Sequence, residues 1–164
     1  MRLAFALLLC AGPAAAEIFI TRHADKRDAK DDASTLSARG LRRAQDLRRV
    51  LSSVPLKAVY CTEYVRSAQT AAPVAKSHGL TPIVTPYDDL AGLVKALRTR
   101  PAREDVLVVG HSDTIPDLLK GLGVAEAVAI ASDDYDDLFI VAPSSGAAGF
   151  HRLHYGAAPT GPKR

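Results

Sequence analysis

Six short apolar segments alternate with segments of helical periodicity along this chain of 164 residues. The apolar segments predict strands, which cover residues 17–21, 56–60, 82–85, 105–109, 137–142 and 149–155. Helices are predicted between them: a first one behind Ser37, with Leu41, Ala44, Leu47 and Leu51 at helical spacing, and others near 65–77, 89–99 and 115–122. Such alternation predicts a mainly parallel sheet with helices on both faces. The expected fold class is therefore α/β, a three-layer α/β/α sandwich.

Composition narrows the class of partner. With 48% hydrophobic and 24% charged residues, the chain has the make-up of one soluble globular domain. A formal net charge of +3 suits a small anionic substrate, but it is far from the dense basic face that a nucleic-acid binder needs. No apolar run is long enough to cross a bilayer. We therefore expect no nucleic-acid partner and no stable membrane insertion; oligomeric state is left open.

The first sixteen residues have the features of a signal peptide. Arg2 supplies a positive charge before an apolar stretch, and Ala14 and Ala16 flank a cleavage point. We expect residues 1–16 to be removed, so that residues 17–164 form the domain, and we expect export to a periplasmic or secreted location. A buried first strand or helix is the alternative.

The two cysteines fit the same interpretation. A lipid-modified Cys10 is disfavoured because the bulky Leu9 precedes it, where a small residue is usual. Removal of the signal peptide leaves Cys61 without an intramolecular partner, and a lone cysteine in an oxidising compartment is predicted to be buried and unreactive.

Polar residues gather where three predicted strands end. Arg22 and His23 follow the first strand, Arg66 opens the helix after the second, and the fourth runs into Gly110 and His111. Ligands of parallel sheets bind outside the carboxyl ends of the strands, so these side chains are predicted to line one crevice. Arginine binds phosphate in bidentate fashion and keeps its charge, and the helix start near Arg66 adds backbone N–H groups. The crevice is therefore predicted to hold a dianion such as a phosphoryl group.

At these positions the sequence resembles the histidine phosphatase superfamily, also called the phosphoglycerate mutase-like family. The resemblance rests on four segments in order, "TRHADK", "LSARGLRRA", "YVRSAQTA" and "VVGHSDTIP", and covers essentially the whole predicted mature chain. It implies a phosphoglycerate mutase-like fold. It also implies that His23 is the nucleophile that becomes phosphorylated, while Arg22, Arg66 and His111 bind and stabilise the transferring group. A neutral imidazole can attack phosphorus without help from a metal, so no metal and no cofactor are expected.

The resemblance further implies an acidic residue that protonates the leaving group. The family takes it from the segment after the third strand, where Asp88 follows the strand end and Asp89 is a natural helix N-cap. We choose Asp88, with Asp113 as its rival, because a distant branch of the superfamily uses the segment after the second histidine. Asp25, beside the nucleophile, is expected to shape substrate contacts.

These residues predict a metal-independent phosphomonoesterase acting through a phosphohistidine on a small phosphorylated substrate. A phosphomutase with the same site and a non-catalytic phosphate-binding module are the alternatives. A protein phosphohistidine phosphatase is conceivable for so short a chain, although export would separate it from cytoplasmic signalling proteins.

Two further patterns are predicted to carry no function. His151 and His154 are three apart on a predicted strand and point to opposite faces, which makes a poor metal pair. The acidic cluster at residues 133–137 lacks the spaced ligands and the glycine of a calcium loop, and is predicted to be a solvated turn.

Overall fold

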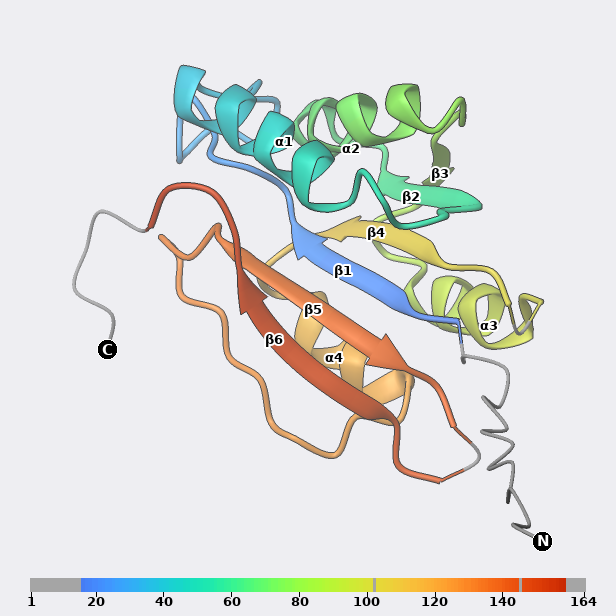
Figure 1. Cartoon of the computed structure of the whole chain (residues 1–164). Helices are drawn as coiled ribbons and strands as arrows, with labels where there is room; N and C mark the ends of the chain where they lie inside the picture. Colours follow the sequence, from blue (N-terminus) through green and yellow to red (C-terminus); the bar gives the residue numbers. More distant parts are fainter. Residues whose placement is uncertain (1–15, 102, 145, 159–164) are drawn as a thin grey trace, which may run out of the picture.

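Six strands form one sheet in the computed structural model, which describes residues 16–101, 103–144 and 146–158 (Figure 1). The strands are β1 (Ile18–Arg22), β2 (Ala58–Thr62), β3 (Ile83–Thr85), β4 (Val106–Gly110), β5 (Asp137–Ala142) and β6 (Gly149–His154). The six predicted strands are all present. β2 begins two residues later than predicted, because Leu56 instead packs into the core from the preceding turn, where its backbone N–H donates to Val54.

The sheet is mostly parallel and has the order β3-β2-β4-β1-β5-β6. β4 lies between β1 and β2 and is parallel to both, and β3 is parallel to β2. β5 runs antiparallel to β1, and β6 antiparallel to β5. The carboxyl ends of β1 and β4 therefore lie side by side, with Arg22 in register with Gly110.

Four helices cover the two faces of the sheet: α1 (Ala38–Val50), α2 (Val65–Ser77), α3 (Leu90–Thr99) and α4 (Ile115–Gly121). The two predicted N-caps are confirmed. The Ser37 hydroxyl accepts from the Gly40 N–H at 3.0 Å, and the Asp89 carboxylate accepts from the Gly92 N–H at 2.9 Å. α1 and α2 lie on one face and α3 and α4 on the other, so the predicted three-layer arrangement is confirmed (Figure 1).

Alternating residues of the central strands explain why both faces are covered. Phe19 packs with Leu47 and Leu51 of α1, whereas Ile18 and Ile20 pack with the residues of α3 and α4. A strand with apolar residues on both faces has to be covered on both. The carboxyl ends of β1 and β4 therefore lie side by side between the two helical layers.

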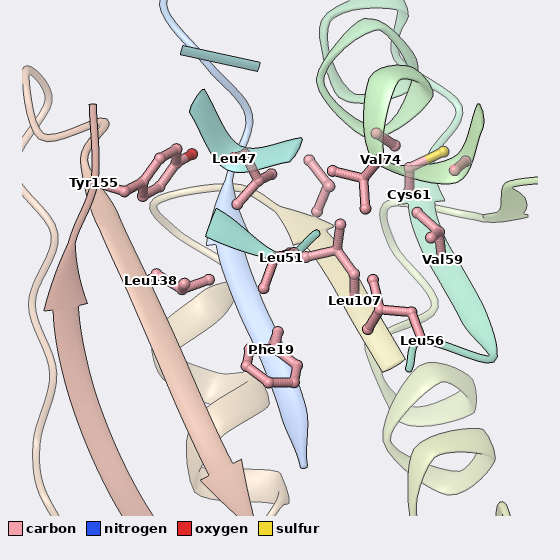
Figure 2. Packing of buried hydrophobic residues seen from close by; sticks show 13 residues of the cluster. Phe19, Leu47, Leu51, Leu56, Val59, Cys61, Val74, Leu107, Leu138 and Tyr155 are labelled. Atoms are coloured by element: carbon pink, nitrogen blue, oxygen red, sulfur yellow. The ribbon is translucent and has the colours of Figure 1, made fainter. Parts of the chain in front are cut away.

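The core beneath α1 and α2 also holds the predicted mature chain's single cysteine (Figure 2). Cys61 is free and 1% exposed, and burial raises the pKa of its thiol. A thiol in this setting reacts slowly, because the thiolate is the reactive form.

The predicted signal peptide lies outside the described residues except for Ala16. In the part of the chain that the structure describes, no helix is long and apolar enough to cross a membrane. The backbone N–H of Glu17 donates to Asp105 at 2.8 Å. The Ala16 carbonyl accepts a hydrogen bond from Arg100 at 3.1 Å.

Candidate active site

The ends of β1 and β4 bring the two predicted site histidines together. The backbone N–H of His23 donates to the Gly110 carbonyl at 2.9 Å, which continues the β1–β4 pairing by one residue. The rings of His23 and His111 then lie with their centroids 5.2 Å apart, and both residues are buried. Sequence separation between them is large, so only the parallel pairing of the two strands creates this contact.

One ring nitrogen of His23 is committed to the backbone. Nδ1 lies 2.8 Å from the carbonyl oxygen of Ala24, and a carbonyl only accepts, so Nδ1 carries the proton. The Ala24 N–H is itself held by Thr70 of α2 at 2.9 Å. Nε2 of the neutral ring is therefore unprotonated, and its lone pair is the nucleophile that the site offers.

Both histidines stay neutral over a wide pH range. The pKa of His23 is lowered to about 3, chiefly by burial and also by the charge of Arg22, against the opposing effect of the Ala24 hydrogen bond. Burial, followed by the charge of Arg66, lowers the pKa of His111 to about 4. A neutral His23 can attack phosphorus at any pH near neutrality.

His111 is oriented by hydroxyl groups from β2 and α2. Its Nε2 lies 2.8 Å from the Thr62 hydroxyl and 3.4 Å from the Ser67 hydroxyl. The Thr62 hydroxyl donates to Ser67 at 2.9 Å and so can accept from His111. This places an N–H on Nε2 and leaves Nδ1 of His111 as the ring nitrogen that can bind another group.

Arg22 has one half of its guanidinium engaged and the other half available. Nη1 donates at 3.0 Å to each of three carbonyls, those of Ala131, Ser132 and Asp134. Nε is buried and has no hydrogen-bond partner among the described residues. Buried donors without partners are rare, because each costs free energy, and here the donor belongs to a side of the guanidinium suited to an oxyanion.

Arg66 repeats this arrangement from the first turn of α2. Its guanidinium lies 4.2 Å from the Tyr64 ring, and Nη1 donates to the Asp32 carbonyl. Its Nε is also buried without a hydrogen-bond partner in the described part of the chain. The structure thus brings together the four residues predicted for phosphoryl binding: Arg22, His23, Arg66 and His111.

Asp113, the rival candidate acid, interacts with residues of this group. The Asp113 carboxylate accepts a hydrogen bond from the Tyr87 hydroxyl at 2.5 Å, and its charge acts on both His111 and Arg22. Asp88 is exposed. The choice of Asp88 stays a prediction, and the contacts favour Asp113.

Asp25 has a different neighbourhood from the one predicted. Its carboxylate binds Nε of Arg43 at 2.7 Å and Nε of Arg39 at 3.1 Å, both on α1. These contacts join the loop after His23 to α1. The predicted substrate contact of Asp25 stays a prediction.

The acidic cluster at 133–137 is not the solvated turn that the sequence predicts. Asp136 and Asp137 are 2% and 1% exposed, and the Tyr135 ring lies 3.9 Å from the Arg22 guanidinium. The carboxylates are buried because Arg152 donates to both oxygens of Asp137, at 2.8 and 2.7 Å. Sequence reasoning missed this role because the partners are far apart in the chain.

Three tyrosines surround the two histidines, and none was predicted. The ring centroids of Tyr64 and Tyr87 lie 5.4 and 5.1 Å from that of His111. The ring centroid of Tyr135 lies 5.9 Å from that of His23. Each tyrosine directly precedes or follows a predicted polar segment, but the hydrophobic periodicity of the sequence does not indicate that it lies in the site. The hydrogen bond to Asp113 raises the pKa of Tyr87 to about 12.

His154, assigned no metal role from its spacing to His151, lies near two carboxylates. Ligand-type atoms of Asp136, Asp137 and His154 lie within 4.8 Å of one another. Arg152 already donates to both oxygens of Asp137, so a guanidinium balances this cluster. His154 is thus part of an ion-pair group next to the Arg22 contacts.

A buried histidine beside two arginines, at the carboxyl ends of parallel strands, is an arrangement suited to phosphoryl transfer. The sequence agrees: residues 18–91 match the family model of the histidine phosphatase superfamily (branch 1). Over these residues the chain is similar to the histidine phosphatase superfamily, which is consistent with a phosphatase-type hydrolase. None of the curated protein sequences matches it significantly.

Solved structures agree with the fold. The protein histidine phosphatase SixA complexed with tungstate is 23% identical, with a TM-score of 0.69, over 84% of this chain and 96% of that one. The α-ribazole phosphatase of Shigella flexneri is 16% identical (TM-score 0.68, 84% and 96% covered). A mycobacterial glucosyl-3-phosphoglycerate phosphatase is 13% identical (TM-score 0.67, 88% and 100%). At these identities the likeness establishes the fold.

Proposed function

We propose that this chain hydrolyses phosphate monoesters of small molecules through a phosphohistidine on His23, without a metal. The observation that carries the proposal is the pair of buried, unpartnered Nε donors of Arg22 and Arg66 beside the free Nε2 of His23. Two guanidinium groups beside one nucleophile suit the equatorial oxygens of a transferring phosphoryl group. The similar structure of SixA was solved in complex with tungstate, which supports an oxyanion ligand for this fold.

The reaction has two balanced steps. In the first, the Nε2 lone pair of His23 attacks phosphorus, the bond from phosphorus to the ester oxygen breaks, and the leaving oxygen takes a proton. In the second, water attacks the phosphohistidine, the N–P bond breaks, and the proton of water passes to the base formed in the first step. The products are the alcohol and inorganic phosphate, and His23 is regenerated.

The nucleophile is tested by trapping the intermediate. Rapid quenching without acid should yield a phosphoenzyme that is acid-labile and base-stable, and His23→Ala should abolish both the label and turnover. Retained labelling in His23→Ala contradicts this mechanism, and activity that disappears with EDTA and returns with zinc or magnesium contradicts its metal independence.

We assign the leaving-group proton to Asp113 because of its contacts with Tyr87 and its charge effect on His111. Burial alone would raise the pKa of Asp113, but the Tyr87 hydrogen bond and neighbouring groups lower it below its usual range. A bound phosphoryl dianion acts in the opposite direction, because a like charge disfavours the carboxylate.

Asp113 and Asp88 are distinguished by the leaving group. An alkoxide needs a proton and p-nitrophenolate does not, and general acid catalysis is commonly worth about 10²- to 10⁴-fold. Asp113→Asn should therefore cripple alkyl phosphate hydrolysis and largely spare p-nitrophenyl phosphate. Asp88→Asn is the matched control and should affect neither. If instead Asp88→Asn impairs only alkyl phosphate hydrolysis and Asp113→Asn impairs neither reaction, Asp88 is the general acid.

A second candidate function, protein phosphohistidine hydrolysis, is favoured by the similarity to SixA, a protein histidine phosphatase. The two are separated by rates on a panel of sugar and alcohol phosphates and on a phosphohistidine-bearing protein. A kcat/KM at least about 100-fold higher on the phosphoprotein, a difference of roughly 3 kcal/mol, would favour the second function.

We also propose that the chain is exported and that the mature protein begins at Glu17. The Glu17 nitrogen lies 2.8 Å from the Asp105 carboxylate, so the α-ammonium created by cleavage would gain an ion pair. Mass-spectrometric sequencing of material from the periplasm or medium should find Glu17 first. An intact Met1 in that material would contradict cleavage.

A further inference from the structure

Arg22 depends on a segment that is remote from it in the chain. We call residues 131–137 the Arg22-binding segment. Its carbonyls at Ala131, Ser132 and Asp134 accept the three hydrogen bonds from Nη1 of Arg22, and its Tyr135 ring lies 3.9 Å from the guanidinium. These contacts decide which way the unpartnered Nε faces.

The Arg22-binding segment needs anchors of its own. Residues 131–136 have no regular secondary structure, so no ladder of backbone hydrogen bonds fixes their shape. Its C-terminal end is held by the Tyr155 N–H, which donates to the Asp136 carbonyl at 2.8 Å, and by the Thr21 hydroxyl, which donates to the Asp137 carbonyl at 2.8 Å. The carbonyls that bind Arg22 lie before these two anchors.

Arg152 of β6 links the two parts of the segment. Its Nε and Nη2 bind the two oxygens of Asp137 at 2.8 and 2.7 Å, and Nη2 also lies 3.5 Å from the Asp134 carboxylate. Asp134 carries one of the carbonyls that accept from Arg22. The Arg152 guanidinium therefore holds Asp134, and the Asp134 carbonyl in turn binds Arg22.

The charges show why a cation is needed there. Burial, and then the charges of Asp137 and Asp136, raise the pKa of Asp134, so the carboxylates of this segment repel one another. His154 lies 3.2 Å from Asp137 but is half exposed and carries a charge only when protonated. Arg152 is charged at every working pH and can bind a carboxylate with both arms.

We propose that Arg152 is a positioning residue for Arg22 and acts on phosphoryl binding through the Arg22-binding segment. The inference rests on the proposed role of Arg22 in the reaction. Without Arg152, Asp134 and Asp137 separate, the carbonyls at 131–134 lose their common direction, and Nε of Arg22 no longer faces the phosphoryl position.

The test is a double-mutant cycle between Arg152→Gln and Arg22→Lys. Two quantities are measured: kcat/KM for p-nitrophenyl phosphate, and the affinity for orthovanadate by titration calorimetry. With Arg22 present, Arg152→Gln should lower both by about tenfold, and in the Arg22→Lys background by less than about twofold. Arg152→Lys should recover part of the loss. Arg48→Gln, an exposed arginine of α1 bonded to Gln45, is the matched control and should change neither quantity.

Equal losses in both Arg22 backgrounds would overturn the proposal, as would a lowered urea midpoint with unchanged vanadate affinity, since both indicate a merely structural role. If Arg152→Gln fails to fold, Arg152→Lys replaces it in the same cycle. A wild-type protein that binds vanadate but hydrolyses no ester contradicts the proposed function alone, and the vanadate cycle still decides the role of Arg152. A wild-type protein that does neither contradicts both.

Discussion

His23 owes its proposed reactivity to a hydrogen bond made by the ring nitrogen that does not react. Because Nδ1 donates to the Ala24 carbonyl, the lone pair is confined to Nε2. His111 has the opposite arrangement, with Nε2 bound to Thr62 and Nδ1 left over. The two rings therefore present different nitrogens to the site, and the neutral His111 ring can donate to a phosphoryl oxygen only after its Nδ1 takes up a proton.

Substitution of Arg66 tests whether the shape of the guanidinium, and not only its charge, contributes to transition-state stabilisation. Arg66→Lys should lose about 2 kcal/mol or more of transition-state stabilisation, because an ammonium cannot bind two phosphoryl oxygens as a fork. The loss should appear in kcat/KM for p-nitrophenyl phosphate and, in parallel, in inhibition by vanadate, which can adopt the five-coordinate geometry of the transition state. Arg48→Lys on the exposed face of α1 serves as the control. An Arg66→Lys enzyme with wild-type kinetics would mean that charge alone suffices.

At the scale of an element, α1 lies against the loop after His23 at a distance that requires glycine. A Cβ on Gly40 would lie 2.2 Å from the Asp25 carbonyl oxygen, which is closer than any real contact. The same carbonyl accepts from the Ser37 N–H at 2.9 Å, and Arg43 of α1 binds the Asp25 carboxylate. The start of α1 therefore holds the loop that carries the nucleophile.

Gly40→Ala tests this contact, because the two possible effects on the free energy of unfolding have opposite signs. In an exposed helix the change is stabilising by about 1 kcal/mol, whereas overpacking commonly costs about 1–3 kcal/mol. We expect the clash to prevail, so that the free energy of unfolding in urea falls by about 1 kcal/mol or more and turnover falls with it. Gln45→Ala, exposed on the same helix, should leave both within error. A stabilised Gly40→Ala protein would show that the loop can move away from α1.

At the scale of the whole molecule, the buried histidines make stability depend on pH. In the unfolded chain each titrates near 6.5, whereas in the folded protein their pKa values are about 3 for His23 and about 4 for His111. Between pH 6.5 and these values the unfolded state binds more protons, so the free energy of unfolding falls as the pH falls. Each histidine should contribute roughly 1–2 kcal/mol to the loss between pH 7 and pH 5.

Urea unfolding at pH 7 and pH 5 measures this loss directly. His23→Asn and His111→Asn each remove one titrating group, so each should flatten the dependence by about its own share of roughly 1–2 kcal/mol. His78→Asn is the comparison, because His78 lies outside the candidate site on the C-cap of α2. If the site variants lose stability with pH as steeply as the wild type, the histidines take up protons in the folded protein as they do in the unfolded chain.

Much of this protein follows from the sequence alone. The alternation of strands and helices predicts the layers, and the N-caps Ser37 and Asp89 begin α1 and α3 as predicted. Arg22 and His23 could be singled out because polar residues directly after a buried strand have few structural reasons to be there. Such features depend on neighbours within a few residues, and periodicity reports them well.

Only the tertiary structure decided what surrounds those residues. Arg22 binds carbonyls 109 to 112 positions away, and burial of Asp137 depends on Arg152 of the neighbouring strand. The acidic cluster therefore resembles a solvated turn in sequence, although Asp136 and Asp137 are buried and its backbone carbonyls bind the Arg22 guanidinium. Asp113 likewise gains its proposed role from Tyr87, on a different loop. Contacts between distant segments form when the sheet order is set, and the local hydrophobic pattern contains no information on which polar groups will then meet.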